Sequence, residues 1–329
     1  MSNITSDPAA GHSGGFTGKV MARHTGFFPR VVAHLLIALW IPSLHAQQLE
    51  PRRWGHLPVG TQFISAAYLY TDGEIFFDPT LRIEDAEMGI NTLNMRYLYS
   101  FDLAGRSARV EVDIPYQDGS WQGIVDGKPT SVSRTGITDP RLRWSVLLSG
   151  APALSGNEFA DYQRTHITNT IIGAGLSITL PSGEYFRDRL INLGGNRLVV
   201  RPEAGVLHTR GKRSWELTGS VSVFEENKEF FPGNGSRKQD PLFLVQGHTT
   251  YTFPNRMWGG VGIGYGFGGE SSIEGVEKDD QHDNYYWALS LGIPLSTNQR
   301  VKLTYAGAHT NNLVGTDSQN FLAAWSLLF

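Results

Sequence analysis

Charged side chains recur at every second position of several short segments, and this spacing limits the chemistry that they can do. In residues 108–114, Arg109, Glu111 and Asp113 alternate with apolar residues, and Arg143 lies in a similar pattern. Because successive side chains of a β-strand point to opposite faces, each segment has one apolar face and one charged face. Charges of both signs on the same face predict ion pairs between neighbouring strands.

Other residues that could carry chemistry are weaker candidates. The glycines of 264–269 match the letters of a dinucleotide motif, but they alternate within a strand pattern and open no helix. The acidic run 277–283 lacks the ligand spacing and the turn glycine of an EF-hand loop. His248 shares a strand face with Gln246, which favours a hydrogen-bonding role. We therefore predict no catalytic residue, no metal site and no cofactor.

The elements that must position these charges are strands. In the last segment, alternate residues are apolar and share one face: Phe321, Ala323, Trp325, Leu327 and Phe329. A terminal Phe preceded by this pattern is typical of the final strand of outer-membrane barrels, which the barrel-assembly machinery reads. A soluble sandwich also alternates, but many Trp and Tyr at strand ends fit the aromatic girdles of a membrane barrel. We predict an all-β fold, a single antiparallel transmembrane β-barrel.

About twelve strands are expected, an even number that suits a single-chain bacterial barrel. The predicted spans are 60–70, 87–101, 107–116, 136–149, 168–180, 197–209, 214–226, 241–253, 257–268, 284–294, 300–309 and 318–329. Connections after even strands are short, as periplasmic turns are, whereas those after odd strands are long: 71–86, 117–135, 181–196, 227–240 and 269–283. The exception is 150–167, in which residues 157–163 are expected to form a short helical turn.

Residues 1–46 are expected to be an N-terminal extension and a secretory signal peptide. A basic stretch precedes the apolar run 31–41, and the small residue Ala46 marks a cleavage point. The run is too short for a stable transmembrane helix. Translation from Met21 rather than Met1 would give the signal a more ordinary length. The mature chain, 47–329, is predicted to be one barrel in the bacterial outer membrane.

Composition excludes several other classes of protein. The chain has 329 residues, no cysteine, 38 glycines, 11% aromatic and 18% charged residues, and a formal net charge of −3. A near-neutral chain lacks the basic patch of a nucleic-acid-binding protein. Without cysteine there is no disulfide or thiolate site, which agrees with export. A mean hydropathy of −0.23 is too low for a bundle of transmembrane helices.

The alternation also sorts the charges that would face the lumen. They are expected to be Arg96, Arg109, Glu111, Asp113, Asp139, Arg141, Arg143, Arg201, Glu203, Glu216, Glu226 and Lys302, with Gln246 and His248 as polar lumen residues. Because the two signs are balanced and interleaved, we expect pairing across the lumen, no strong ionic preference and a narrow interior. The same network would equally fill and stabilise a barrel that transports nothing.

A set of short motifs runs in order through most of the mature chain: 136–141, 149–154, 180–185, 189–197, 201–205, 230–234, 239–241 and 246–248. In these motifs the chain resembles the putative meta-pathway of phenol degradation family of outer-membrane, transporter-like proteins. The resemblance implies a role in moving phenols and related aromatics across the outer membrane, and it supplies no established transport residues. This chain departs from the family pattern after Tyr185, where Phe186 and Arg187 stand in place of Asp-Pro.

We therefore expect a monomeric channel, not an enzyme, that passes small hydrophobic or aromatic compounds passively. Aromatic side chains offer apolar contact and ring stacking, and the candidate substrate contacts are Phe76, Phe77, Phe186, Phe230, Phe231 and Tyr286. The expected partners are outer-membrane lipid and lipopolysaccharide, the barrel-assembly machinery and these solutes, with no nucleic acid. The alternatives are a structural or surface-interaction barrel without transport and, less favoured, an outer-membrane lipid hydrolase.

Overall fold

The computed structural model describes residues 49–77, 82–232 and 234–329. The predicted signal peptide, its cleavage after Ala46 and the choice between Met1 and Met21 lie outside the described residues. Within the described part of the chain, no helix is long and apolar enough to cross a membrane.

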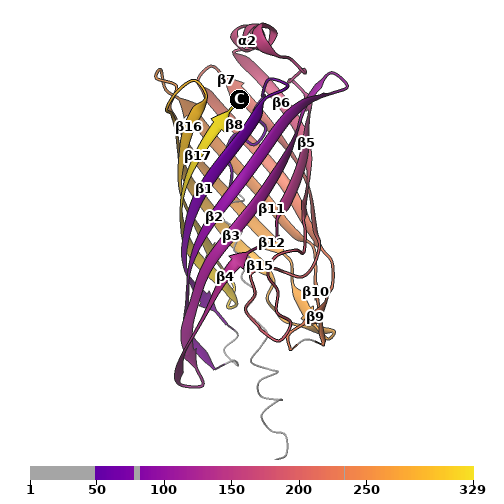
Figure 1. The fold of residues 1–329 in the computed structure, drawn as a ribbon, viewed down its shortest axis with the longest axis vertical. Helices are drawn as coiled ribbons and strands as arrows, with labels where there is room; N and C mark the ends of the chain where they lie inside the picture. The colour runs from indigo at the N-terminus through magenta and orange to yellow at the C-terminus, as the bar shows by residue number, and fades with distance from the viewer. Residues whose placement is uncertain (1–48, 78–81, 233) are drawn as a thin grey trace, which may run out of the picture.

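Twelve strands of the described chain form a closed antiparallel barrel (Figure 1). They are β1 (Gln62–Phe76), β2 (Ile83–Leu103), β3 (Arg106–Val125), β5 (Arg141–Ser149), β6 (Thr168–Thr179), β7 (Val199–Arg210), β8 (Arg213–Phe224), β11 (Leu242–Thr252), β12 (Trp258–Gly268), β15 (His282–Pro294), β16 (Gln299–Thr310) and β17 (Gly315–Leu328). The barrel closes where β1 pairs with β17, from Phe63 opposite Leu328 to Phe76 opposite Gly315. The prediction of an all-β, twelve-stranded barrel is confirmed.

The barrel wall has an apolar outer face and a mostly polar inner face. On β2, the outward side chains of Leu93 and Met95 are about half exposed, at 49% and 50%, whereas the inward Thr92 and Asn94 are buried. Outward aromatic residues such as Trp215 and Trp325 are also exposed. An apolar outer band with aromatic residues is what a lipid-facing barrel requires, and the alternation in the sequence predicted it.

The two ends of the barrel differ as the connection lengths predicted. Tight turns such as that at Gly105, whose N–H donates to Asp102 at 2.7 Å, lie at one end together with the C-terminus (Figure 1). Helix α2 (Gly156–Thr165) lies at the same end, where a short helical turn was expected. Because outer-membrane barrels keep short turns on the periplasmic side, we name this the periplasmic end and the opposite one the outer end.

The outer end holds more strand than the sequence predicted. Strands β1, β2 and β3 continue well past the expected limits, and β4 (Lys128–Ile137) pairs with the outer half of β3, so most of 71–86 and 117–135 is not loop. Four short strands form a second sheet there: β9 (Asn227–Phe230), β10 (Gly235–Gln239), β13 (Ser271–Ile273) and β14 (Val276–Glu277). In the outer parts of these strands polar residues occupy both faces and weaken the alternation. The sequence pattern therefore predicted strands that were too short.

The predicted strand 136–149 is interrupted in the structure. Residues 138–140 are not in a strand, and Pro140 has no N–H to give to a ladder. On the outer side of this break β4 pairs with β3, whereas β5 pairs with both β3 and β6. The segment 181–196 lies beside β4 instead, with the Glu184 N–H donating to the Ile137 carbonyl at 2.9 Å.

Candidate functional site: the lumen and its inner segment

Residues 49–57, which we call the inner segment, fold into the lumen before β1 begins. Trp54 is fully buried, and its Nε1–H donates to Thr218 Oγ1 on β8 at 2.8 Å. Its indole lies against Gly173 of β6 and Gly205 of β7, where an added Cβ would approach the ring to 2.2 Å. Glycine at these two inward positions therefore makes the room that the indole occupies.

Arg53 anchors the inner segment to the wall electrostatically. Its guanidinium forms a buried ion pair with Glu203 of β7, and its backbone N–H donates to Glu216 Oε1 at 3.2 Å. Glu203 also accepts from Arg143 Nε of β5 at 2.5 Å. The Glu203 side chain is only 1% exposed, so both of its ion pairs are shielded from water. A buried charge of this kind is tolerated because it is paired and hydrogen-bonded.

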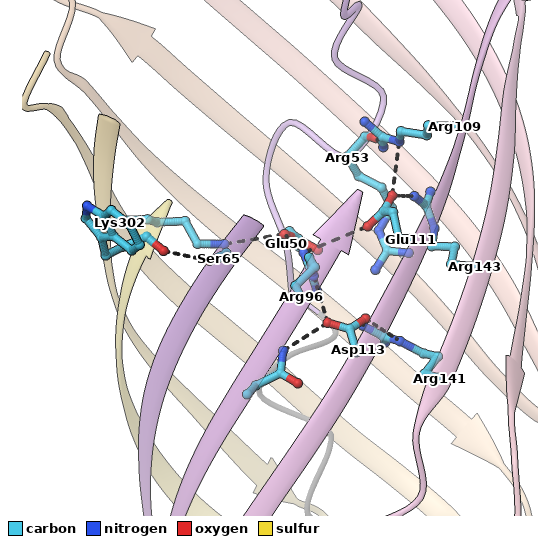
Figure 2. A network of polar contacts seen from close by, with 12 residues as sticks. Glu50, Arg53, Ser65, Arg96, Arg109, Glu111, Asp113, Arg141, Arg143 and Lys302 are labelled. Atoms are coloured by element: carbon cyan, nitrogen blue, oxygen red, sulfur yellow. Dashed lines mark hydrogen bonds and ion pairs between the residues drawn. The ribbon is translucent and has the colours of Figure 1, made fainter. Parts of the chain in front are cut away.

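Glu50 forms the second anchor, on the opposite side of the lumen. Its Oε1 lies 2.9 Å from Arg96 Nη1 on β2 and 3.4 Å from Lys302 Nζ on β16 (Figure 2). Burial raises the pKa of the Glu50 carboxyl, but the cations of Arg96 and Lys302 outweigh this effect and hold the pKa well below its usual value. Glu50 therefore stays ionised at neutral pH and holds the inner segment between two walls.

The two anchors belong to one network on the inner faces of β2, β3 and β5. Arg96 Nε donates to Asp113 at 2.7 Å, and Arg141 donates to the same carboxylate at 2.8 Å (Figure 2). Glu111 pairs with Arg109 at 3.0 Å and also with Arg143. Arg109 in turn donates to the backbone carbonyl of Arg53. The wall charges thus hold the inner segment as well as each other.

The structure places most of the predicted lumen charges in this network. Arg201 is buried in the lumen without an ion pair to a described residue, and two other predicted charges lie outside the lumen. Asp139 lies in the break between β4 and β5, where its carboxylate accepts from the N–H groups of Gly183 and Gly195 at 2.8 and 2.7 Å. It holds the loop 181–196 in place. Glu226 lies beyond the end of β8. The expectation of both residues as lumen charges rested on extending the alternation past the ends of the strands.

The sign of the lumen charge also differs from the expected balance. In the described residues the lumen and the inner segment from Glu50 to Arg53 hold more cations than acids. The inward cations are Arg52, Arg53, Arg96, Arg109, Arg141, Arg143, Arg201 and Lys302, and the acids are Glu50, Glu111, Asp113, Glu203 and Glu216. Arg201 Nε and Nη2 are buried with no hydrogen-bond partner in the described structure. The lumen is therefore net cationic.

The two predicted polar lumen residues lie side by side on β11. His248 Nε2 is 3.0 Å from Gln246 Oε1, and both side chains are buried. The His248 ring lies over Gly262 of β12, where an added Cβ would come within 2.4 Å of Nδ1. The inward glycines of β12 thus accommodate large neighbours, as the strand pattern of 264–269 suggested, and they open no helix.

The predicted aromatic contacts are scattered. Phe77 is buried and faces inward, whereas Phe76 lies on the opposite strand face. Tyr286 is buried in the lumen, where it packs with Leu49 and other apolar residues. The remaining three lie at the outer end, Phe230 as the last residue of β9 and the other two in loops. Phe186 is 42% exposed under Arg189, Phe230 is buried near Arg237, and Phe231 is half-buried in the following turn.

Along β1, β2 and β3 the outer half of the lumen is apolar. The buried cluster there consists of Ile75, Phe77, Met88, Ile90, Trp121 and Ile191. Ile191 comes from the segment 181–196, so this outer loop is part of the cluster. The short strands β9, β10 and β13 of the outer end instead bury polar and charged side chains such as Asn227, Arg237 and Ser271. Below the cluster, towards the periplasmic end, the inward residues Thr92 and Gln117 bond to each other at 3.0 Å, and the charged network follows. Along β2 and β3 the lumen therefore changes from apolar to polar to charged.

A cavity of about 470 Å³ remains beside the inner segment. It follows the inward faces of β1, β16 and β17 from the periplasmic turns to Leu69 and Asn320. Its volume is in the range of small-molecule sites. The inner segment thus fills one side of the lumen and leaves the other side open to a small molecule.

Sequence reasoning missed the inner segment. Glu50, Arg53 and Trp54 precede the first strand and follow no alternation, so nothing in their spacing assigns them to the lumen. One signal was available, because inward glycines on two neighbouring strands, Gly173 and Gly205, imply that something bulky fills the space opposite them.

Comparisons with known proteins agree with this architecture. The model of the family described as "Putative MetA-pathway of phenol degradation" matches residues 87–325. An outer membrane channel from Pseudomonas putida F1 is 20% identical, with a TM-score of 0.70, over 85% of this chain and 100% of that one. This likeness concerns the fold. No curated protein matches the chain.

More distant barrels also align with the chain. The toluene transporter TbuX from Ralstonia pickettii has 9% identity and a TM-score of 0.43, over 83% of this chain and 90% of that one. The transport unit of the autotransporter AIDA-I from Escherichia coli has 7% identity and a TM-score of 0.45, over 91% and 96%. These scores are too low to support an argument about function. The closed barrel and the channel from Pseudomonas putida F1 point to the bacterial outer membrane.

Proposed function

Because the chain belongs to the family described as "Putative MetA-pathway of phenol degradation", we propose that it is an outer-membrane channel that passes small hydrophobic or aromatic compounds passively. The observation that carries this proposal is the apolar outer half of the lumen. Phe77 and Trp121 face inward there, and Ile191 of the outer loop packs with them. A phenol that leaves water gains apolar contact with these side chains.

The inner half of the lumen fits a narrow passage for a small molecule rather than a wide pore. The inner segment fills part of the lumen, and the cavity of about 470 Å³ beside it has the size of a small-molecule site. A solute that leaves the apolar outer half would reach the periplasm along this cavity. No energy source is needed, because a concentration gradient suffices for a passive channel.

Flux into liposomes tests the proposal. Vesicles with and without the folded protein are given phenol, and an enzyme inside the vesicles that oxidises phenol reports its arrival. We expect faster phenol arrival with the protein. Replacing the inward Phe77 with serine (Phe77→Ser) should slow it, whereas Phe76→Ser on the opposite strand face serves as the matched control. Flux equal to that of bare lipid would remove the transport proposal and favour a structural or surface-interaction barrel.

The same vesicles test the enzyme alternative, because a lipid hydrolase would release fatty acid from them. We propose no such activity. We also propose that the barrel is a monomer and that it contacts lipopolysaccharide through its outer end. The assembly machinery would read the outward residues Phe321, Trp325 and Leu327 of β17 together with Phe329, which follows the strand.

A further inference from the structure

The charged side chains that line the cavity beside the inner segment are mostly cationic. Five cationic side chains line it, and one carboxylate: Arg52, Arg96, Arg256, Arg300 and Lys302 against Glu50. Glu50 is already engaged with Arg96 at 2.9 Å and Lys302 at 3.4 Å. Among the described residues that line the cavity, no other carboxylate compensates the remaining cations. Low-dielectric walls around charges of one sign concentrate their field and attract counter-ions.

Two aromatic side chains also line the cavity, Trp258 of β12 and Phe63 of β1. The Trp258 indole lies over Gly292 of β15, where an added Cβ would come within 1.9 Å of Nε1, so the glycine makes room for the ring. The Arg52 guanidinium stacks over this indole at 4.7 Å from the ring centre. Aromatic rings and guanidinium groups are therefore adjacent at the periplasmic mouth.

We propose that this cavity binds an organic anion that carries an aromatic ring, namely an aromatic carboxylate. The ring would lie against Trp258, and the carboxylate would face Arg300 and Arg256. Guanidinium groups suit a carboxylate because their planar donors match its two oxygens. This inference rests on the proposed function, which it makes more specific: the channel would handle the acids of aromatic compounds at its periplasmic end.

The inner segment compensates only part of the cationic lining of the cavity. Glu50 neutralises the deepest cations, Arg96 and Lys302, and its backbone neighbours Leu49 and Pro51 line the cavity. The exposed cations Arg256 and Arg300 have no ion pair with a described residue of the chain. They stand at the mouth, where they would meet an incoming anion first.

Calorimetry on the folded barrel in detergent tests the inference, with benzoate as the probe. Benzyl alcohol is the uncharged comparison of similar shape, and acetate is the anion without a ring. We expect benzoate to bind more tightly than either, and its affinity to fall as salt rises from low to high concentration. The double variant Arg256→Gln/Arg300→Gln should weaken benzoate binding by roughly three- to tenfold.

The matched control is Lys212→Gln, which removes a cation from a turn at the same end that does not line the cavity. It should leave benzoate affinity unchanged. Benzoate that binds no tighter than benzyl alcohol, or a double variant that binds like the wild type, would overturn the inference. Phenol flux separates the two proposals: flux without benzoate binding removes only this inference, and benzoate binding without flux removes only the channel.

Discussion

The outer and inner halves of the lumen differ in the side chains that the strands turn inward. In the outer half, β1, β2 and β3 present Ile75, Ile90 and Trp121, which pack with the loop residue Ile191. In the inner half, the same strands present charges such as Arg96 and Glu111, which pair with each other and with the inner segment. One strand thus changes from apolar to charged along a single face. The difference teaches that the lumen is graded along β2 and β3, from an apolar outer part to a charged inner part that the inner segment partly fills.

The largest expected effect tests the charged half. Glu203→Gln removes the carboxylate that holds Arg53 and Arg143, which leaves the buried Arg53 without its ion-pair partner and Arg143 with Glu111 alone. Breaking a buried pair in this way costs about 3–5 kcal/mol. We expect urea to unfold the variant at a clearly lower concentration in detergent micelles. A midpoint equal to that of the wild type would show that the network contributes nothing to stability.

A smaller effect tests how the inner segment is seated. Gly173→Ala adds a Cβ that would lie 2.2 Å from the Trp54 ring, so the indole must shift. Such overpacking costs about 1–3 kcal/mol. The control is Gly219→Ala, because nothing lies within 4 Å of an added Cβ there. Urea unfolding of both variants measures the difference, and equal midpoints would mean that Trp54 is not seated on these glycines.

The apolar half should respond less to a small change. Ile90 is 1% exposed in the outer cluster, and Ile90→Val removes one methylene from it. Loss of one buried methylene costs about 0.5–1.5 kcal/mol. We expect this variant to keep its affinity for benzoate, because Ile90 does not line the cavity. A loss of benzoate binding in the variant would show that the two halves are coupled.

The smallest effect concerns an ion pair outside the lumen. Arg164 and Asp161 pair on the surface of α2, with side chains 76% and 61% exposed. Exposed pairs contribute little because water screens them and ordering the side chains costs entropy. We expect Arg164→Ala to leave the urea midpoint unchanged. A drop as large as that of Glu203→Gln would contradict the contrast between buried and exposed pairs.

The alternation of polar and apolar residues was enough to predict the barrel, its number of strands and the face of the barrel wall on which most charges lie. Arg96, Glu111 and Arg143 were expected on neighbouring strands, and the structure brings them within ion-pair distance. The period of two fixes which face a residue occupies once a strand exists. The period does not determine where a strand ends. For this reason Asp139 and Glu226, which lie outside the strands, were assigned to the lumen.

The inner segment and the sign of the lumen charge could not be predicted from periodicity. Arg53 and Glu50 reach the lumen because a non-periodic stretch folds back into the barrel. This depends on contacts between residues far apart in the sequence, such as Arg53 and Glu203, which are 150 residues apart. Net lumen charge is a small difference between two large sets. Asp139 and Glu226 leave the predicted set, whereas the acid Glu50 and the cations Arg52 and Arg53 join it, which changes the balance into a cationic excess.

Single-channel conductance tests most directly the claim that the inner segment partly fills a graded lumen. Deleting residues 49–57 removes Trp54 and both anchors, and Trp54→Ala removes only the indole that fills the space beside Gly173 and Gly205. In planar bilayers, with folding checked by heat-modifiable migration, we predict that both variants conduct more ions than the wild type, the deletion most. Conductance equal to that of the wild type in both folded variants would contradict the account.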